Sequence, residues 1–316
     1  MRVSVIISNR NDTAMLAVTV RSILEELKAV PSGGEVVICD NSDKQQWDWI
    51  RSGEFVAKRY FHDKQVRLYR QEEPCLFTAR ETAIEQAKGE YIMCLDSHML
   101  VGHNTIIDLV NFMNRHKDDE KVAFAHAPIS WVHQHEMHAK HDRDVAKHEL
   151  GPWGAAYDHD QRITWKGMPW MCRKNFWKKI GGYGALAEHH VAWGGGDMHI
   201  GVKPWLLGYE NWAVPCSPCI HIGPFSQRAR QEYTYRVYSQ SGRHTTSIGF
   251  LISCYILGGE EMMKRNAPVV KEKFKLDIEG NWEKAKKLGQ REKDWLDTNK
   301  VMSFQEWLER KPWNAH

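Results

Sequence analysis

The sequence predicts an α/β fold in which helices flank a mostly parallel β-sheet. The chain begins with a β-branched run at residues 3–7, continues with apolar side chains at helical spacing through residues 13–29, and returns to an apolar run in the segment EVVICDNSD. This order is that of a βαβ unit, whose two strands lie parallel and are joined by a crossover helix. Strand-like and helical patterns then alternate as far as residue 126, which predicts that the sheet continues.

Each predicted element follows from the spacing of its apolar residues. The first helix presents one apolar face, formed by Leu16, Val20, Ile23, Leu24 and Leu27, and Pro31 with the glycines after it ends the helix. Further strands are predicted at residues 66–69, 90–95 and 121–126, and helices at about 77–88 and 104–116. Residues 259–311 have the pattern of charged amphipathic helices.

Bulk composition is that of a soluble globular protein. Hydrophobic residues make up 42% and charged residues 26% of the 316-residue chain, which is long enough for one large domain or two small ones. No apolar run approaches the roughly 20 residues that span a bilayer, and the first residues resemble a strand rather than a signal peptide. Seven irregularly spaced cysteines favour a reduced, intracellular setting. We therefore expect a cytoplasmic protein without a membrane anchor.

Acidic residues follow two of the predicted parallel strands. Asp40 ends the second strand, and Asp96 ends the strand at residues 90–95. Open α/β sheets bind their ligands in the crevice outside the carboxyl ends of the strands. The sequence therefore predicts a nucleotide-type site at this edge of the sheet.

The segment YIMCLDSHMLV places a carboxylate and an imidazole two residues apart, at Asp96 and His98. Side chains at this spacing in extended backbone point to the same side, and a carboxylate with an imidazole suits a divalent ion such as Mn²⁺. In the other interpretation, Asp96 caps the helix that follows and His98 packs on it. These two residues alone leave both interpretations open.

Several ordered segments resemble glycosyltransferases of the GT-A fold, and above all the polypeptide N-acetylgalactosaminyltransferases, whose metal motif is also Asp-Ser-His. VSVIISNRND is similar to the family's first strand and its Asn-Glu turn, with Asp12 in place of Glu. This match assigns Ser8 and Asn9 to nucleotide binding. VVICDNSD is similar to the second strand, which places Asp40 on the uracil or ribose. FTARETAIEQAKGEYIMCLDSH is similar to the helix that precedes the metal motif, with Arg80 at the arginine position.

The resemblance continues through residue 225. GMPWMCRKNFWKKIGGYG, which begins at Gly167, is similar to the family's Gly-Gly-Leu-Phe segment, and Gly167 is assigned to the nucleotide-sugar site. WGGGDMHIGVKPWLLGYENWAVPCSPCIH is similar to the Trp-Gly-Gly-Glu-Asn segment that runs on to Pro-Cys-Ser and a histidine. The match places His221 as the third metal ligand and Trp193 over the donor, although packing in the core remains open for Trp193.

What the resemblance implies is a metal-dependent glycosyltransferase that uses a UDP-sugar and retains configuration. Asp96, His98 and His221 are expected to bind Mn²⁺ or Mg²⁺. Arg80, or Arg70 upstream of it, is expected to lie near the phosphates, and a surface salt bridge is the other interpretation of either arginine. One departure concerns the acceptor: Gly196 stands where the family has Glu, and an acid follows at Asp197. Asp197 is expected to orient or deprotonate the acceptor hydroxyl.

Residues 1–224 are predicted to form the catalytic domain, and residues 225–316 a mobile loop with a helical extension packed on that domain. Arginine and tyrosine are interleaved at residues 225–246, which is typical of a surface that binds a nucleic-acid backbone and stacks on bases. In the other interpretation, these residues are the solvated surface of a lid and a helical cap. Hydroxymethylated DNA is therefore one acceptor hypothesis, beside a glycan or a protein hydroxyl. Two other functions remain open, an inactive GT-A binding module and a nucleotidyltransferase.

Overall fold

The β-branched run at the start of the chain forms the central strand β1 (Val3–Asn9) of the computed structural model. The model describes residues 2–52, 63–133, 136–138, 159–164, 167–222, 243–274 and 277–312. β1 lies parallel to β2 (Gly34–Asp40) on one side and to β4 (Tyr91–Asp96) on the other. All seven residues of β1 are buried, as expected for a parallel strand with helices on both faces of its sheet.

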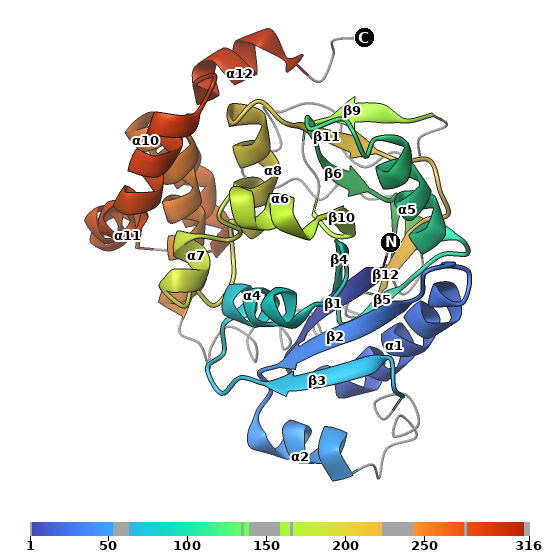
Figure 1. Ribbon diagram of the computed structural model, residues 1–316. Helices are drawn as coiled ribbons and strands as arrows, with labels where there is room; N and C mark the ends of the chain where they lie inside the picture. The colour runs from blue at the N-terminus through green and yellow to red at the C-terminus, as the bar shows by residue number, and fades with distance from the viewer. Residues whose placement is uncertain are drawn as a thin grey trace.

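β1 belongs to an eight-stranded sheet among the described residues (Figure 1). In spatial order its strands are β3 (Val66–Arg70), β2, β1, β4, β10 (Trp170–Arg173), β6 (Val122–His126), β11 (Glu210–Ala213) and β9 (Gln161–Ile163). The first four strands are parallel, so the predicted βαβ beginning is confirmed. β10 pairs antiparallel with both β4 and β6, and the sequence pattern did not predict it.

Helices cover both faces of this sheet (Figure 1). α1 (Thr13–Leu27) and α5 (Thr105–Arg115) lie together on one face. α4 (Leu76–Gln86), α6 (Lys174–Lys179) and α8 (Gly196–Leu206) lie on the other, with the short α7 (Ala185–Glu188) beside α4. The predicted helices and strands up to residue 126 are present within a few residues of their predicted ends. α2 (Lys44–Ser52), which follows β2, was not predicted.

A smaller sheet lies against the carboxyl end of β4. Its strands, in spatial order, are β5 (Met99–Leu100), β12 (Cys219–Ile222), β7 (Ile129–His133) and β8 (Glu136–His138). The chain passes from β4 to β5 through a two-residue turn, so it leaves the large sheet and enters the small one within a few residues. β12 pairs antiparallel with β5, and His221 lies opposite Met99.

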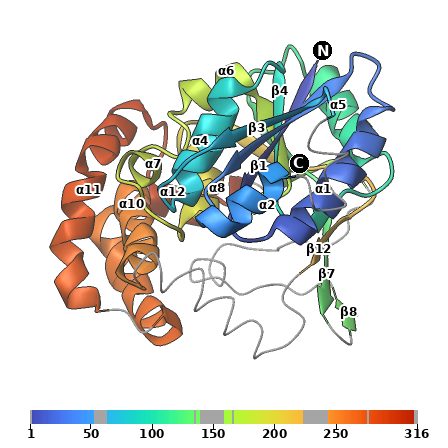
Figure 2. The same ribbon diagram turned by 90° about the horizontal axis from the view of Figure 1, so that it is seen from below.

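From residue 243 onward the described residues are mainly helical, and the amphipathic helices predicted within residues 259–311 are present. α10 (Arg243–Phe274), with a kink at Gly259, lies beside α11 (Ile278–Asn299), and α12 (Phe304–Arg310) follows (Figure 2). α10 and α12 contact α8, and α11 contacts α7. The predicted domain boundary at residue 225 lies outside the described residues. In the part of the chain that is described, no helix combines the length and the apolar character needed to cross a membrane.

Candidate functional site

Polar side chains lie together at the carboxyl ends of β2, β1 and β4, which are neighbours in the large sheet. Asn9 is paired with Asp40 in the β1–β2 register, and Ser8 is paired with Asp96 across β1 and β4. This is the edge at which open α/β sheets bind their ligands. Four of the residues predicted for a nucleotide site, Ser8, Asn9, Asp40 and Asp96, are therefore adjacent in space.

The three predicted metal ligands also lie together. Asp96 ends β4, His98 is in the turn after it, and His221 is in β12. The Nε2 atoms of His98 and His221 are 3.2 Å apart, although 123 residues separate the two histidines in sequence. His221 Nε2 is 3.5 Å from Asp96 Oδ2. One ligand atom from each of the three residues lies within 4.8 Å of the others.

The helix-capping interpretation of Asp96 does not hold. The segment that follows Asp96 is a turn leading into β5, and the next helix, α5, starts only at Thr105 with Asn104 at its N-cap. The Asp96 carboxylate instead contacts His221 and Arg80. Asp96 therefore belongs to the cluster at the strand ends.

The donor atoms of this cluster fit a divalent metal ion. Burial would raise the pKa of the Asp96 carboxyl, but the His221 hydrogen bond and the Arg80 charge hold that pKa well below its usual value. Asp96 is therefore a carboxylate at neutral pH. One carboxylate oxygen and two imidazole nitrogens form a mixed set that suits a borderline cation such as Mn²⁺.

Backbone contacts fix the turn that contains His98. Thr19 of α1 donates its hydroxyl to the Ser97 carbonyl at 2.8 Å and accepts from the Met99 amide at 3.1 Å. On the other side, the Ile222 amide in β12 donates to the His98 carbonyl at 2.9 Å. The turn is thus held by α1 and by the strand that contains His221.

Arg80 lies beneath Asp96 and is buried, with 4% of its surface exposed. Its guanidinium donates to Asp96 Oδ1 at 2.7 Å and to the Tyr183 hydroxyl at 3.0 Å, and it also lies over the Tyr183 ring. These contacts support Asp96 in its position. Direct contact of Arg80 with phosphates stays a prediction.

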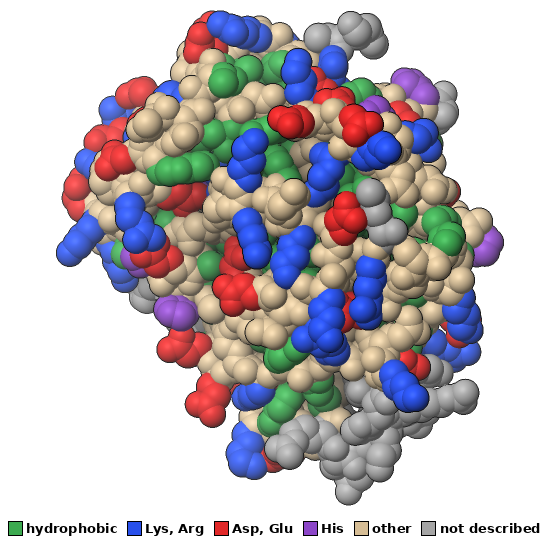
Figure 3. Space-filling model, in the orientation of Figure 1, with side chains coloured by type: hydrophobic (Ala, Val, Ile, Leu, Met, Phe, Trp, Pro, Cys, Tyr) green, Lys and Arg blue, Asp and Glu red, His purple; other side chains and the backbone are tan. Residues whose placement is uncertain are grey.

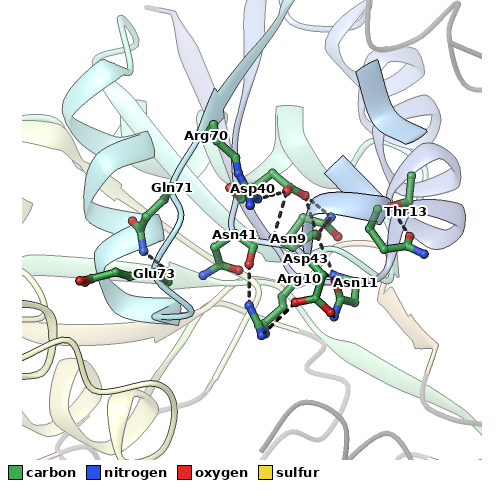
Figure 4. Close-up of polar contacts among 12 residues, drawn as sticks. Asn9, Arg10, Asn11, Thr13, Asp40, Asn41, Asp43, Arg70, Gln71 and Glu73 are labelled. Carbon is green, nitrogen blue, oxygen red and sulfur yellow. Dashed lines mark hydrogen bonds and ion pairs between the residues drawn. The ribbon is translucent and has the colours of Figure 1, made fainter. Parts of the chain in front are cut away.

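Asp40 is the centre of a buried polar network (Figure 4). Its Oδ1 accepts from the Ser42 amide and the Arg70 guanidinium, each at 3.0 Å. Its Oδ2 accepts from Asn9 Nδ2 at 2.5 Å and from the Ser42 hydroxyl at 2.9 Å. A carboxylate offers about four acceptor positions, so this network uses them all. The contact of Asp40 with uracil or ribose stays a prediction.

Two buried polar atoms beside Asp40, unlike the carboxylate oxygens of Asp40 itself, still have hydrogen-bonding capacity to offer. Within the described part of the chain, Ser8 Oγ and Asn9 Oδ1 are buried and have no hydrogen-bond partner. Buried polar groups are nearly always hydrogen-bonded, because leaving one unpaired costs about 1–3 kcal/mol. Both atoms belong to residues predicted to bind the nucleotide.

The departure at Gly196 has a steric explanation. Gly196 is the first residue of α8, and a Cβ at this position would overlap the Phe77 ring of α4. Phe77 in turn packs on Tyr183, with ring centroids 4.9 Å apart. A side chain at position 196 would therefore clash with the Phe77 ring, and the next residue along α8, Asp197, is the acid that follows it.

Asp197 lies in the first turn of α8, and its charge acts favourably on Arg80. Gly167 lies directly against it: a Cβ on Gly167 would be 2.8 Å from Asp197 Oδ2. The structure thus gives Gly167 a place beside the predicted acceptor-binding acid, where a side chain would crowd the carboxylate. Its predicted contact with the nucleotide-sugar remains untested.

Trp193 is partly buried and packs against the core. Its ring meets Phe250 of α10 edge-on, with centroids 6.0 Å apart. The packing interpretation therefore has structural support, and the role of Trp193 over the donor stays a prediction. Most of the predicted mobile loop and of the Arg/Tyr segment falls within residues 223–242, outside the described residues.

Sequence reasoning gave no role to three residues at this site, namely Asp12, Thr19 and Tyr183. Asp12 contacts His98, Thr19 holds the backbone of the turn, and Tyr183 contacts Arg80. Only Asp12 and Tyr183 lie within segments that resemble the family. Thr19 is an ordinary helix residue in sequence, and no pattern distinguishes it.

Solved structures with the same architecture include glycosyltransferases of the GT-A fold. The crystal structure of GalNAc-T7 with UDP, GalNAc and Mn²⁺ matches 98% of this chain and 56% of that one, with a TM-score of 0.65 and 18% identity. The structure of Staphylococcus aureus TarS 1–349 in complex with UDP-GlcNAc matches 98% of this chain and 85% of that one, with a TM-score of 0.53 and 13% identity.

Sequence comparison gives a relative and a family. The probable N-acetylgalactosaminyltransferase 9 of Caenorhabditis elegans is 24% identical over 215 residues, which cover 60% of this chain and 34% of the relative. The chain thus matches about a third of that relative's length. The model of Glycosyl transferase family 2 matches residues 4–168, more than half of the chain, and includes Ser8, Asp40, Asp96 and His98. The chain belongs to glycosyl transferase family 2.

Proposed function

We propose that this protein transfers a sugar from a UDP-sugar to a hydroxyl of an acceptor, with a divalent metal ion bound by Asp96, His98 and His221. The observation that carries the proposal is the meeting of these three side chains at the strand ends of a family 2 glycosyl transferase. Two structures with this fold support the choice of donor, since one contains UDP and Mn²⁺ and the other UDP-GlcNAc.

The nucleoside is proposed to bind at the ends of β1 and β2. The unpaired Ser8 hydroxyl and Asn9 carbonyl oxygen are the groups there that still need partners. A uracil or ribose offers N–H and O–H donors to such acceptors. Asp40, whose carboxylate accepts from Asn9 Nδ2, fixes the direction in which the Asn9 amide oxygen points.

Sugar transfer requires that negative charge on the departing diphosphate be stabilised. When bound, a divalent ion supplies that stabilisation as a Lewis acid. The protein's own residues hold its ligands: Arg80 fixes Asp96, and the β12 backbone fixes His98. The buried guanidinium of Arg80 also adds positive charge beneath this site.

Asp197 is the proposed acceptor-binding group. Its place in the first turn of α8, against Gly167, gives it a defined position in which to accept a hydrogen bond from a hydroxyl. In a retaining reaction Asp197 would orient that hydroxyl, and in an inverting one it would remove its proton. We propose the retaining course on the resemblance to N-acetylgalactosaminyltransferases, and the anomeric configuration of the product, read by NMR, decides it.

The acceptor is proposed to be hydroxymethylated DNA, a glycan or a protein hydroxyl. Some basic side chains of α10 and α11 are paired with acids, as in Lys264 with Glu261 at 3.0 Å and Lys286 with Glu260 at 2.6 Å, which reduces the positive charge that these helices offer to DNA. Basic and acidic side chains are also interspersed on the face shown in Figure 3. Binding of a DNA acceptor would weaken steeply as the salt concentration rises. This salt dependence distinguishes a DNA acceptor from a glycan or a protein.

The two alternative functions, an inactive GT-A binding module and a nucleotidyltransferase, predict different products in an activity assay. An inactive GT-A module would bind UDP-sugar without turnover. A nucleotidyltransferase would release diphosphate from a nucleoside triphosphate, but the loop after β1, SNRNDTAM, lacks the glycines and lysine that cradle a triphosphate.

The test is a donor and acceptor screen with Mn²⁺. UDP-glucose, UDP-GlcNAc and UDP-GalNAc are each paired with hydroxymethylated DNA, plain DNA, an oligosaccharide and a peptide, and transfer and UDP release are measured. We expect His221→Ala to lower turnover about 100-fold or more, because charge stabilisation is lost, while the circular dichroism spectrum is unchanged.

His103→Ala is the matched control, since the His103 side chain is 87% exposed and lies outside the cluster. Its turnover should equal that of the wild type. Full activity of His221→Ala would overturn the metal assignment, and failure of every donor to release UDP would overturn the proposed function.

A further inference from the structure

We propose that Asp12 is a positioning residue that holds the His98 imidazole with its proton on Nδ1 and its Nε2 lone pair directed at the metal site. This inference rests on the proposed function, since it concerns one of the three proposed ligands. It assigns a role to a residue at the start of α1, 86 positions away from His98 in sequence.

The contact between the two side chains is direct. Asp12 Oδ2 lies 2.8 Å from His98 Nδ1, and both side chains are 18% exposed. The Ser97 hydroxyl donates to the same oxygen at 3.3 Å. The carboxylate therefore accepts from two consecutive residues of the metal-binding turn.

The Asp12 side chain does not cap α1, although Asp12 occupies the N-cap position of that helix. It is the N-cap residue of α1, where an aspartate side chain usually accepts from the first free amides of the helix. Here the side chain makes no capping hydrogen bond, although its backbone carbonyl accepts from the Leu16 amide in the usual way. The carboxylate is turned away from the helix and toward His98.

The chemistry of the pair determines the tautomer. An ionised carboxylate only accepts hydrogen bonds, so the His98 nitrogen that faces it must be a donor. A neutral imidazole with its proton on Nδ1 has a lone pair on Nε2, the atom that is 3.2 Å from His221 Nε2. Carboxylate partners of this kind commonly orient metal-binding histidines and increase their basicity.

If Asp12 served only to stabilise the turn, its substitution would mainly affect folding, but other residues already hold the backbone of the turn. The turn backbone is already held by Thr19 and Ile222, so loss of the Asp12 charge should leave the turn in place. Asp12 Oδ2, by contrast, contacts the imidazole ring itself. A change at Asp12 should therefore affect metal affinity more than folding.

Three variants test the inference with Mn²⁺ alone, titrated by electron paramagnetic resonance without donor or acceptor. Asp12→Asn keeps the size of the side chain and removes its charge, and we expect the Kd for Mn²⁺ to rise about 10- to 100-fold. Asp12→Glu keeps the carboxylate and should restore most of the affinity. Asp43→Asn, the same change at an exposed aspartate of the neighbouring loop, should bind Mn²⁺ as the wild type does.

The second readout is the ¹⁵N NMR spectrum of His98, identified by its absence in His98→Gln. The wild type and Asp12→Glu should show protonated Nδ1 and unprotonated Nε2, and Asp12→Asn a mixture of tautomers. Wild-type affinity in Asp12→Asn, or a wild-type His98 with its proton on Nε2, would overturn the role of Asp12 alone. If the wild type binds no Mn²⁺, the inference and the proposed metal site fall together.

Discussion

Arg80 and Tyr183 determine how Asp96 is held, because the buried guanidinium joins the Asp96 carboxylate to the tyrosine hydroxyl. A hydrogen bond to a buried charged group contributes more to stability than one between neutral groups. We therefore expect the Tyr183 hydroxyl to affect the site through its contact with Arg80. Its loss would leave one guanidinium N–H without a partner.

We expect Tyr183→Phe to lower the free energy of unfolding by about 1.5–3 kcal/mol and to weaken Mn²⁺ binding, because Arg80 no longer has a fixed position. Urea denaturation and Mn²⁺ titration measure the two effects. Tyr91→Phe is the control: the buried Tyr91 donates to the neutral Asn114 at 3.0 Å, so its loss should cost about 1 kcal/mol and leave Mn²⁺ affinity unchanged. Equal results for both variants would argue against this role of Tyr183.

At the level of single residues, the sequence pointed to the three side chains that meet at the strand ends, but not to the residues that hold them in place. Asp96, His98 and His221 belong to short motifs whose residue types suit a metal. The Asp12–His98 contact depends on how the N-cap of α1 is turned, and no local pattern in the sequence determines that direction. Asp40 was found by its position at a strand end, but its saturated hydrogen bonding is visible only in three dimensions.

At the level of elements, α8 is positioned by close packing of glycines at its start. A Cβ on Gly195 would be 2.5 Å from the Gly249 carbonyl of α10 and 2.6 Å from Ser253 Oγ, and a Cβ on Gly196 would overlap Phe77. Gly195 also has φ = 77°, a conformation that favours glycine. The helix that contains Asp197 is therefore fixed between α4 and α10.

A glutamate at position 196, as in the N-acetylgalactosaminyltransferases that the sequence resembles, should not increase the turnover rate. We expect Gly196→Glu to lower the free energy of unfolding by about 1–3 kcal/mol through overpacking against Phe77, with no gain in turnover. Adding Phe77→Ala should make the double variant more stable than the sum of the two single effects, because the residues are in contact. A stable Gly196→Glu protein with higher turnover would show that Phe77 does not exclude the glutamate.

The strands illustrate what a sequence pattern can and cannot predict. β1, β2 and β4 were predicted because buried parallel strands have continuous apolar sequences with polar residues at their ends. β10 is a short run of four residues inserted antiparallel between β4 and β6. Its place is set by pairing with residues far away in sequence, which local periodicity does not contain.

At the scale of the whole molecule, a buried ion cluster joins the C-terminal helices to the sheet domain. Lys203 of α8 is fully buried, and its ammonium donates to Glu292 of α11 at 2.8 Å and to the Gly182 carbonyl at 2.7 Å. His199 Nε2 lies 2.9 Å from the same Glu292 oxygen. Burial would raise the pKa of Glu292, but His199 and Lys203 hold it well below its usual value.

Removal of Glu292 would leave the Lys203 charge buried without its counter-ion. We expect Glu292→Ala to lower the free energy of unfolding by about 3–5 kcal/mol, measured by urea denaturation. Replacing both partners by Lys203→Met and Glu292→Leu should recover most of this loss. Glu283→Ala, which removes an 80%-exposed partner of Lys286, should change the free energy of unfolding by less than about 1 kcal/mol. If Glu292→Ala were as mild as this control, the cluster would not anchor α11.

His98 stands at the point where the chain passes from the large sheet into the small one, and His221 lies on the far side of that junction, in β12. A ligand shared by Asp96, His98 and His221 therefore bridges two sheets. By thermodynamic linkage, a ligand present at a hundredfold excess over its Kd stabilises the bound fold by about 2.7 kcal/mol. If the proposed ion binds there, the docking of the two sheets and the occupancy of the site are thermodynamically coupled, and the free energy of unfolding should rise with the concentration of the ion.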